Sequence, residues 1–312
     1  MKKAVQNTLI VQAVLLASVL CGCQRESDTL SVDEAISFVP RVLPLSDDAV
    51  EGTKGSLKES ATLATSDIFH ISAWTDAAAP ETAPAHTIPS GSKVIYRTSL
   101  YKDPYWITVD AEGHDVEYLV KKDRRMVFYA YSNLPSADGA ASVSDTYDGQ
   151  VLSYDVSKAA ASDMQTDILM ACQEHTASSG TVPLQFCHPL VAVSFKKGTI
   201  SAGCSIAAIA IEGVYKSASA MITPESAAQT AVADKFLWSD MTGETTVSLS
   251  GVTVDATTHQ IGSYLLLIPQ DFTSNVSARI RVTLADGLDI YYPLKEKWES
   301  GHIVTYTISF EK

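Results

Sequence analysis

Cys187 and His188 are neighbours in the sequence, and their side chains are of the types that nucleophilic catalysis uses. A histidine within hydrogen-bond reach of a thiol can take its proton and make it a nucleophile. However, the pair follows an apolar run typical of a strand, where adjacent side chains point to opposite faces. We therefore expect one residue in the core and the other outside. Because Gly-x-Gly-x-x-Gly and Gly-x-Ser-x-Gly are also missing, the sequence predicts no catalytic residues and no enzyme.

Acidic side chains gather between two strand-like segments, where Asp110, Glu112 and Asp115 offer oxygen atoms that suit Ca²⁺. The full pattern of an EF-hand calcium loop is missing, and a solvated hairpin tip accounts for the same residues. The seven histidines are scattered, and no two have the spacing of paired metal ligands. We predict no metal site and no cofactor.

Four tryptophans could offer a flat platform to a carbohydrate ring. They are Trp74, Trp106, Trp238 and Trp298. An indole is also a large apolar side chain, and its commoner use is to fill a core. Core packing is therefore the favoured interpretation for each of them, and carbohydrate binding stays open as an alternative.

The N-terminus has the pattern of an export signal. Lys2 and Lys3 form a basic start, and residues 9–20 form an apolar stretch interrupted by Gln12. This stretch is too short for a membrane-spanning helix, which needs about 20 residues. It predicts the core of a signal peptide instead.

The signal ends in the pattern of a bacterial lipobox. Residues 20–23 read Leu-Cys-Gly-Cys, with an aliphatic residue three before the last cysteine and a small one directly before it. We predict that residues 1–22 are removed and that Cys23 is acylated. Buried acyl methylenes, at ~0.8 kcal/mol each, would hold the protein on outer-membrane lipid without a transmembrane helix.

Length and charge limit what the remaining chain can be. The 312 residues minus the 22 of the signal leave 290, which fits two ordinary domains better than one. Removal of Lys2 and Lys3 takes the formal net charge from −13 to −15. An acidic chain with scattered basic residues does not attract nucleic acid, so we expect no nucleic-acid partner.

Cysteines beyond the signal are few: Cys172, Cys187 and Cys204 form an odd set without close pairs. The absence of Cys-x-x-Cys argues against structural zinc. One disulfide bridge can be drawn, and buried free thiols are the simpler expectation. Stability must then come from hydrophobic cores.

Short apolar or alternating runs, separated by turn residues, follow one another from residue 68 onward. The expected strands are 68–74, 94–100, 105–109, 116–120, 126–131, 182–186, 190–195, 205–211, 215–221, 264–268, 277–284, 288–292 and 303–310. Helical periodicity is limited to about one turn near 157–165. Many short strands without strand–helix alternation predict an all-β protein built of sandwiches or Greek-key barrels.

Turn-forming residues mark the expected loops. Residues 77–90 are rich in Ala, Pro and Thr, and residues 136–150 are rich in Ser, Ala, Asp and Gly. Glu212-Gly213-Val214 is expected to separate two strands, and Asp286-Gly287 to form a tight hairpin turn. The break between 196–198 and Cys204 is the expected domain boundary.

One apolar island interrupts the polar residues 24–67. Its Ile36 and Phe38 alternate with Ser37, as in a strand with one buried face. Pro40 restricts that strand to an edge or a strand end, because proline lacks the N–H that an interior strand donates.

Five segments, in this order, resemble those of the fimbrillins, the pilin subunits of lipoprotein-derived type V pili. They are Phe-His-Ile-Ser-Ala-Trp at 69–74, Val-Phe-Tyr-Ala-Tyr-Ser at 127–132, Asp-Ile-Leu-Met-Ala at 167–171, Val-Pro-Leu-Gln-Phe-Cys-His-Pro-Leu-Val-Ala-Val-Ser-Phe at 182–195 and Trp-Glu-Ser-Gly-His-Ile-Val-Thr-Tyr at 298–306. Each segment is short, and their order over most of residues 68–310 carries the resemblance.

The resemblance implies two transthyretin-like Greek-key β-sandwich domains and a place at the cell outer membrane, on the cell surface, in a fimbrium. The expected division is a signal peptide at 1–22, an N-terminal segment at 23–67 with a removable strand at about 34–41, one sandwich at 68–199 and a second at 200–312.

Assembly by donor-strand exchange is also implied. In such pilins a protease cuts after an arginine near the N-terminus and frees a strand, and the groove left behind takes a strand from another pilin subunit. Here the removable strand would carry Ile36 and Phe38, and Arg41 is the expected processing site. Lys54 and Lys58 are alternative sites, and a charged strand end would explain Arg41 as well.

A tip or minor position in the pilus is expected. The strand at 303–310 is followed by Glu311 and Lys312, which at ~3.6 Å per residue cannot reach a neighbouring subunit. We therefore expect the chain to accept a donor strand from a shaft or adaptor pilin and to give none. A tip subunit would bind a host glycan or protein. The alternative is a monomeric surface lipoprotein that binds carbohydrate or a host ligand.

Overall fold

The computed structural model describes residues 34–47, 62–77, 83–98, 103–121, 124–176, 180–275 and 277–310. They belong to one compact unit, residues 33–312. Strands make up most of it, which confirms the predicted all-β class. Among the described residues, no helix has the length and apolar character needed to cross a membrane.

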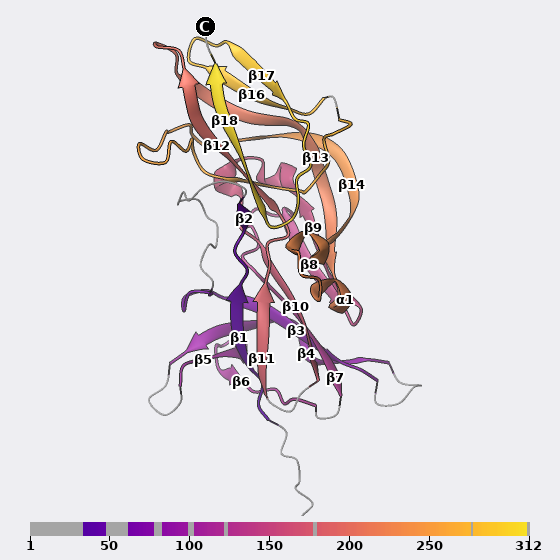
Figure 1. Cartoon of the computed structure of the whole chain (residues 1–312). Coiled ribbons are helices and arrows are strands. Elements are labelled where there is room, and N and C mark those ends of the chain that lie inside the picture. Colours follow the sequence, from indigo (N-terminus) through magenta and orange to yellow (C-terminus); the bar gives the residue numbers. More distant parts are fainter. Residues whose placement is uncertain are drawn as a thin grey trace, which may run out of the picture. The chain divides into compact units, whose positions relative to one another are not determined.

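The first sheet has the order β10-β7-β3-β4-β5-β1-β11, with β6 beside β5. Its strands are β1 (Ser37–Val42), β3 (Phe69–Thr75), β4 (Ala85–Arg97), β5 (Tyr105–Val109), β6 (Asp115–Val116), β7 (Arg125–Ser132), β10 (Leu169–Thr176) and β11 (Thr181–Phe186). Neighbours pair antiparallel except β1 and β11, which run parallel and side by side (Figure 1). The nearly continuous apolar sequence of β7 fits the burial of both its faces, because Val127 and Tyr129 lie in one core and Met126 and Phe128 in the other.

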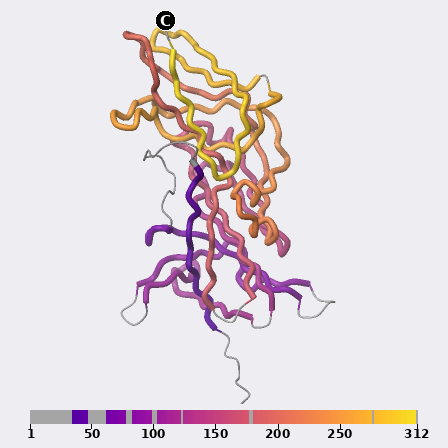
Figure 2. Tube along the Cα trace, in the orientation of Figure 1, coloured from indigo at the N-terminus to yellow at the C-terminus, as the bar shows by residue number. Residues whose placement is uncertain are grey.

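The second sheet has the order β15-β12-β18-β2. Its strands are β2 (Ser46–Asp47), β12 (Val191–Ile200), β15 (Leu265–Leu267) and β18 (His302–Phe310). β18 runs parallel to β12 and, at its first two residues, parallel to β2. The indigo N-terminal strand therefore leads from one sheet toward the yellow C-terminal strand (Figure 2).

The third sheet has the order β17-β16-β13-β9-β8, and β14 pairs with β13. Its strands are β8 (Ala141–Thr146), β9 (Gly149–Asp155), β13 (Ile206–Ile222), β14 (Leu237–Ser248), β16 (Arg279–Leu284) and β17 (Asp289–Pro293). The short helices are η1 (Val156–Ala159), η2 (Ser162–Met164), α1 (Pro224–Ala227) and η3 (Val232–Lys235). The single helical turn expected near 157–165 is thus present as η1 and η2, and the Asp-Gly hairpin lies between β16 and β17 as predicted.

β13 corrects one prediction. The expected break at Glu212-Gly213-Val214 is a bulge inside one strand of 17 residues, where the pairing with β14 shifts register. Gly213 has φ +78°, a conformation that glycine adopts without strain and that a bulge requires. Gly213 therefore has the turn-like backbone conformation that the sequence indicated, but the strand continues through it.

The two expected loops were also partly wrong. Residues 85–90 lie in β4, where Ile88 pairs with Ala73, and residues 141–146 form β8, which pairs with β9. β14 was not expected at all. Small and polar side chains read as loop in the sequence, but tertiary pairing with an apolar neighbour overrides weak β-propensity.

Two hydrophobic cores lie under these sheets. The smaller core gathers Phe38, Phe69, Phe128 and Phe186, among others. The larger core contains Phe195 and residues on both sides of position 200. The boundary between 199 and 200 falls at the end of β12, and the division into two sandwich domains stays a prediction.

Candidate functional site

The strand β1 lies in a slot of the first sheet, and alternate side chains fill it. Ile36, Phe38 and Val42 are only 4, 4 and 3% exposed, whereas Val39 is 43% exposed. This is the period of two expected of a strand with one buried face. The sequence therefore located the strand and its buried residues correctly.

Phe38 is the centre of the slot. The centroid of its ring lies 5.9 Å from that of Phe69, with an angle of 82° between the ring planes. For Phe128 the centroid distance is 6.3 Å and the angle is 73°. Phe69 in turn lies 5.5 Å from Trp106 and 5.4 Å from Phe186. Edge-to-face contacts of this kind add to the area buried by each ring. The slot is thus lined by an aromatic cluster, into which β1 places the ring of Phe38.

The backbone of β1 is paired mainly on one side. Ser37 N donates to Gly180 O at 2.8 Å, and Leu43 N donates to Phe186 O at 2.8 Å. Since alternate residues of a strand point their N–H groups to the same side, the odd-numbered residues of β1 face β11. The even-numbered Ile36 donates to Tyr118 O on the other side, and Phe38 pairs with Trp106 there.

Pro40 follows the last pair with β5. Its missing N–H would point to the side where, among the described residues, β1 has no partner beyond Phe38. β1 is thus not an edge strand, since it lies between β5 and β11. Pro40 is tolerated because it lies on the side where the pairing has already ended.

Gly180 lies against the start of β1 and forms hydrogen bonds with it. Its N–H donates to Glu34 Oε2 at 2.7 Å, and a Cβ at this position would lie 2.1 Å from Ala35 O. Only glycine allows this approach of two backbones. Sequence reasoning missed Gly180; its place directly before the apolar run at 182–186 was the one available signal.

Arg41 lies inside β1, where it pairs with Gln185 and has an exposed side chain. The guanidinium can therefore be reached from solvent, while the peptide bond that follows is part of a paired strand. Downstream, Ser46 N donates to Gly301 O at 2.9 Å, and Leu43 and Leu45 pack on the larger core. Cys23, Lys54 and Lys58 lie outside the described residues.

Cys187 and His188 do not form the pair that their adjacency suggested. Each is 2% exposed, so the expectation that one lies outside was wrong. Cys187 follows the end of β11, where strand alternation stops. Its Sγ lies 3.7 Å from Gln185 O, whereas His188 Nδ1 lies 2.8 Å from Asp167 Oδ1.

The buried thiols are poor nucleophiles. Burial raises the pKa of Cys187 to about 11 and that of Cys172 to about 12. A thiol is reactive as its thiolate, which these values make rare near neutral pH. Both residues and the half-buried Cys204 are free cysteines.

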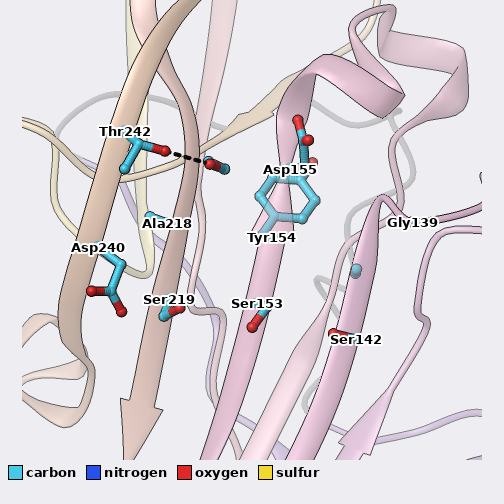
Figure 3. Close-up of a pocket in the computed structure, with 11 residues that line it drawn as sticks. Gly139, Ser142, Ser153, Tyr154, Asp155, Ala218, Ser219, Asp240 and Thr242 are labelled. Atoms are coloured by element: carbon cyan, nitrogen blue, oxygen red, sulfur yellow. Dashed lines mark hydrogen bonds between the residues drawn. The ribbon is translucent and has the colours of Figure 1, made fainter.

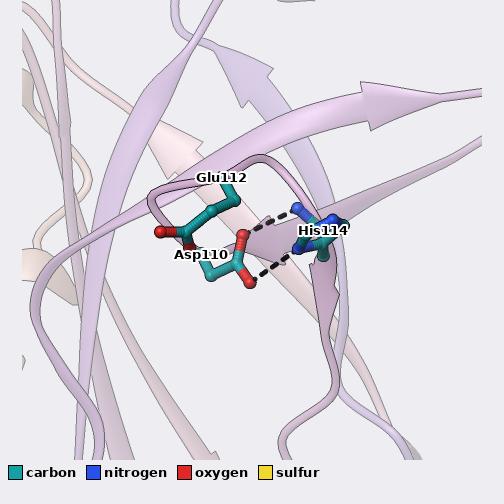
Figure 4. A group of neighbouring side chains, drawn as sticks. All are labelled: Asp110, Glu112 and His114. Atoms are coloured by element: carbon teal, nitrogen blue, oxygen red, sulfur yellow. Dashed lines mark hydrogen bonds and ion pairs between the residues drawn. The ribbon is translucent and has the colours of Figure 1, made fainter.

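Asp110, Glu112 and His114 come together in the turn between β5 and β6 (Figure 4). Asp110 Oδ1 accepts from His114 N at 2.7 Å, and Oδ2 lies 3.1 Å from His114 Nδ1. The backbone hydrogen bond from His114 lowers the pKa of Asp110. Asp115 lies apart from this group and pairs with Arg97 at 2.9 Å. The hydrogen bonds of Asp110 and the ion pair of Asp115 stabilise the hairpin, which accounts for these two acidic residues.

The tryptophans divide into two kinds. Trp106 and Trp298 are 7 and 1% exposed, as core packing predicts. Trp74 and Trp238 are half-buried, and each directs its N–H to a protein acceptor: Asp145 Oδ2 at 2.8 Å and Ser300 Oγ at 2.9 Å.

A shallow groove of about 360 Å³ crosses β8, β9, β13 and β14 (Figure 3). Ser142, Ser153 and Ser219 stand at paired positions of three adjacent strands and line it. Ser217 Oγ and Thr242 Oγ1 lie 2.8 Å apart beside them. Asp155 and Asp240 add two carboxylates to this lining, and the ring of Tyr154 is buried, at 1% exposed, so the groove has no open aromatic ring.

Comparison with known proteins gives solved structures that are similar to this chain. A solved structure of a candidate cell adhesion protein from Bacteroides ovatus is 17% identical, with a TM-score of 0.56 over 89% of this chain and 93% of that one. A fimbrial protein from Bacteroides ovatus is 11% identical, with a TM-score of 0.38 over 89% of this chain and 49% of that one. Comparison with curated proteins gives no match.

The first of these structures supports the fold and, at that identity, nothing more. The family evidence is the match of residues 50–312 to the fimbrillin-like family model, which covers most of the chain. The order of short motifs from residue 69 to residue 306 had suggested the same relationship. The chain belongs to the fimbrillin-like family.

Proposed function

We propose that this chain is a structural subunit of a cell-surface pilus, assembled by donor-strand exchange, and that β1 is the strand that leaves. The observation that supports this most directly is the slot itself. One short segment near the N-terminus places Ile36, Phe38 and Val42 in an aromatic core and pairs along β11. A strand from another subunit with the same alternation could take its place by β-augmentation.

The energetics favour exchange over an empty slot. Full burial of Ile36 and Phe38, the two buried side chains that a cut after Arg41 removes, contributes about 1.5–3 kcal/mol each, or about 3–6 kcal/mol in all. An open slot would lose that burial and would also leave the carbonyl and N–H groups of β11 without partners. A cut protein therefore binds a new strand tightly, and the joint is slow to reverse.

Arg41 is the processing site in this proposal, and Cys23 the lipid anchor before processing. A cut after Arg41 leaves Val42 as the new N-terminus and separates Ile36 and Phe38 from the body. The anchor would hold the precursor at the outer membrane, and the cut would release it into a fimbrium on the cell surface. Catalysis has no part in this function, which fits the protonated, buried thiols of Cys172 and Cys187.

A tip or minor position is the finer part of the proposal. β18 pairs with β12 from Ile303 to Phe310 and places Ile308 in the larger core. To donate this strand the chain would have to open its own second sheet. We therefore propose that the subunit accepts a strand from a shaft or adaptor pilin and that its exposed surface carries an adhesive site.

N-terminal sequencing of protein sheared from the cell surface as filaments tests the proposal. Val42 is the expected first residue. Arg41→Gln should stay cell-bound with β1 in place, whereas Arg279→Gln, which removes an exposed arginine from β16, should assemble normally. Filament protein that begins elsewhere, or Arg41→Gln that assembles as well as the wild type, would contradict the role of Arg41.

The competing function is a monomeric surface lipoprotein that binds carbohydrate. It predicts that the protein stays on its acyl anchor with residues 34–41 intact. Purification from the membrane as an uncut monomer, with no filament fraction, would support that function and overturn pilus assembly.

A further inference from the structure

A second hollow of about 360 Å³ lies beside β13 and β14, away from the β1 slot. Tyr215 and Met241 come from these strands, and Asp271 and Lys297 come from segments before β16 and β18. The half-buried Trp238 completes the apolar part of its wall. The volume lies within the range of ligand pockets, about 300–1,000 Å³.

Trp238 is the one tryptophan with a ring free to receive a ligand. Trp106 and Trp298 are buried, and the ring centroid of Trp74 lies 3.6 Å from that of His86. Among the described residues, no aromatic ring or cation stacks on Trp238. Its N–H bond to Ser300 Oγ, with Ser300 only 2% exposed, fixes the ring at its edge; part of the side chain packs against the larger core and part lines the pocket.

Tyr215 is also held in place. Its backbone N–H donates to Gln270 Oε1 at 3.1 Å, and Gln270 Nε2 donates to Ile268 O at 3.0 Å. No described group bonds the Tyr215 hydroxyl, so it can donate to and accept from a ligand. The wall is thus pre-formed by buried polar contacts.

Charges of both signs stand at the rim. Lys297 Nζ lies 2.8 Å from Glu299 Oε1, and Lys297 and Asp271 are paired across an isolated bridge. A backbone hydrogen bond from Thr273 lowers the pKa of Asp271, so this carboxylate is ionised near neutral pH. The hydrogen bond with Glu299 raises the pKa of Lys297, and the charges of Asp271 and Asp234 add to this effect.

Three carboxylates outnumber the one ammonium at this pocket, so it selects against an anion. Among the described residues, these carboxylates do not form a group that could hold a metal ion. Each hydroxyl of an uncharged polyol both donates and accepts, so it can bond a carboxylate at one side and the ammonium or phenol at another. The apolar C–H face of a sugar ring can cover the indole.

We infer that this pocket binds an uncharged sugar ring, with Trp238 as its stacking platform and Tyr215, Asp271 and Lys297 as its polar contacts. No residue of β1, β5 or β11 lines the pocket. The inference therefore goes beyond strand exchange and does not depend on it. The serine groove of equal volume lacks the open ring and serves as the internal comparison.

Indole N–H signals test the inference directly. The full chain labelled with ¹⁵N-tryptophan should give one signal for each of its four tryptophans, assigned with single Trp→Phe variants. The probes are the methyl glycosides of galactose, mannose, fucose and N-acetylglucosamine, at up to about 50 mM because single sugars bind with millimolar Kd. We expect at least one glycoside to shift the Trp238 signal in a saturable manner and to leave the Trp74 signal unchanged.

Variants then separate binding from folding, with the affinity measured by saturation-transfer NMR on the glycoside protons, because substitution of Trp238 removes its own signal. Trp238→Ala should weaken the affinity at least about tenfold, and Tyr215→Phe about three- to tenfold, since these remove the platform and one hydroxyl contact. Trp74→Phe, which alters the other half-buried indole, should bind as the wild type. Trp238→Phe keeps a ring in place if Trp238→Ala fails to fold, and should weaken binding only about two- to fivefold.

Three outcomes would overturn the inference. One is that none of the four glycosides shifts the Trp238 signal. Another is that tetramethylammonium or sulfate shifts it and no glycoside does. The third is a glycoside affinity that both Trp238→Ala and Tyr215→Phe leave unchanged. Because the chain need not assemble for this measurement, its failure and a failure of pilus assembly are distinguishable.

Discussion

β1 and β18 are each held by a parallel neighbour on one side, β11 for the first and β12 for the second. On the other side β1 meets β5 at one residue pair and β18 meets β2 at two. The strands differ in their side chains. β1 buries every second residue, whereas in β18 only Ile308 is buried.

β18 adds polar contacts to the packing of its half-buried apolar side chains on the larger core. Thr305 Oγ1 lies 2.8 Å from Ser194 Oγ, and the Tyr306 hydroxyl accepts from Trp298 Nε1 at 3.0 Å. Apolar slots tolerate other side chains of similar size, while hydrogen-bonded partners must match atom for atom. Under the proposed function, β1 is the strand that another sequence replaces and β18 is the strand that stays.

The largest effect is expected at the centre of the slot. Phe38→Ala should lower the free energy of unfolding of the uncut precursor by about 3–5 kcal/mol, because it leaves a cavity among aromatic rings. Val39→Ala, which changes an exposed residue of the same strand, should stay within about 0.5 kcal/mol. Urea titration of precursor and cut protein makes the measurement.

The cut protein supplies the decisive control for Phe38. Once residues 34–41 have left, Phe38→Ala and the wild type should have the same stability and bind a donor peptide equally. A difference that persists after the cut would show that Phe38 stays in the body, and β1 would not be the exchanged strand.

Two glycines extend the comparison to the backbone. A Cβ at Gly180 would meet the carbonyl group of Ala35 at 2.1 Å, and a Cβ at Gly198 would meet the Ser309 hydroxyl at 2.1 Å. A hydroxyl can rotate away and a strand backbone cannot. Gly180→Ala should therefore cost about 1–3 kcal/mol and Gly198→Ala distinctly less.

Trypsin provides a second measurement for the glycines. Gly180→Ala should speed cutting at Arg41, because it pushes the start of β1 away from β11, and Gly198→Ala should not. Equal cutting rates in the two variants would mean that β1 opens by some route other than its start.

Tyr306→Phe probes the polar attachment of β18. It leaves the N–H of Trp298, a residue only 1% exposed, without its acceptor. The expected loss is about 1–2 kcal/mol in chemical denaturation, with no change in trypsin cutting at Arg41. Tyr291→Phe, at an exposed hydroxyl, is the matched control and should cost less than about 0.5 kcal/mol. Faster cutting at Arg41 in Tyr306→Phe would mean that the two strands are coupled.

Much of this comparison was visible in the sequence. The alternation of Ile36 and Phe38 predicted a strand with one buried face, and the clean alternation at 303–310 predicted β18. Apolar periodicity reports burial directly, so it locates such strands well. β8 and β14 were missed because they are largely exposed, with Ser, Thr and Asp at many positions, and only pairing makes them strands.

The candidate sites were also predicted only in part. Local pattern located β1, but the approach of Gly180 to Ala35 joins residues that lie 145 positions apart, and no local pattern encodes it. The pocket beside Trp238 likewise combines strand residues with the distant Asp271 and Lys297. The adjacency of Cys187 and His188 misled because the chain leaves the strand between β11 and β12, so both side chains turn inward.

The last test needs no substitution, because it measures how fast the native cysteines are labelled. Cys187 follows β11, beside β1, whereas Cys204 follows β12, and Ser201 three residues before it donates to Phe310 O of β18. Cys204 is half-buried, so a thiol reagent should label it in the folded precursor. Cys187 is 2% exposed with a pKa of about 11, so at pH 8 about one molecule in a thousand carries the thiolate and labelling should be slow.

Removal of β1 should change only one of these rates. The cut leaves Val42 and Leu43, which pair with Phe186 next to Cys187, as a free chain end. As this end frays, the burial that raises the pKa of Cys187 is lost, and labelling should speed up at least about tenfold at pH 8. Cys204 should react as before, and Cys172, buried in β10 with a pKa of about 12, should stay slow. Donor peptide should then slow Cys187 again. If Cys187 and Cys204 speed up together, the cut loosens the whole fold, and the distinction between an exchangeable β1 and a permanent β18 is lost.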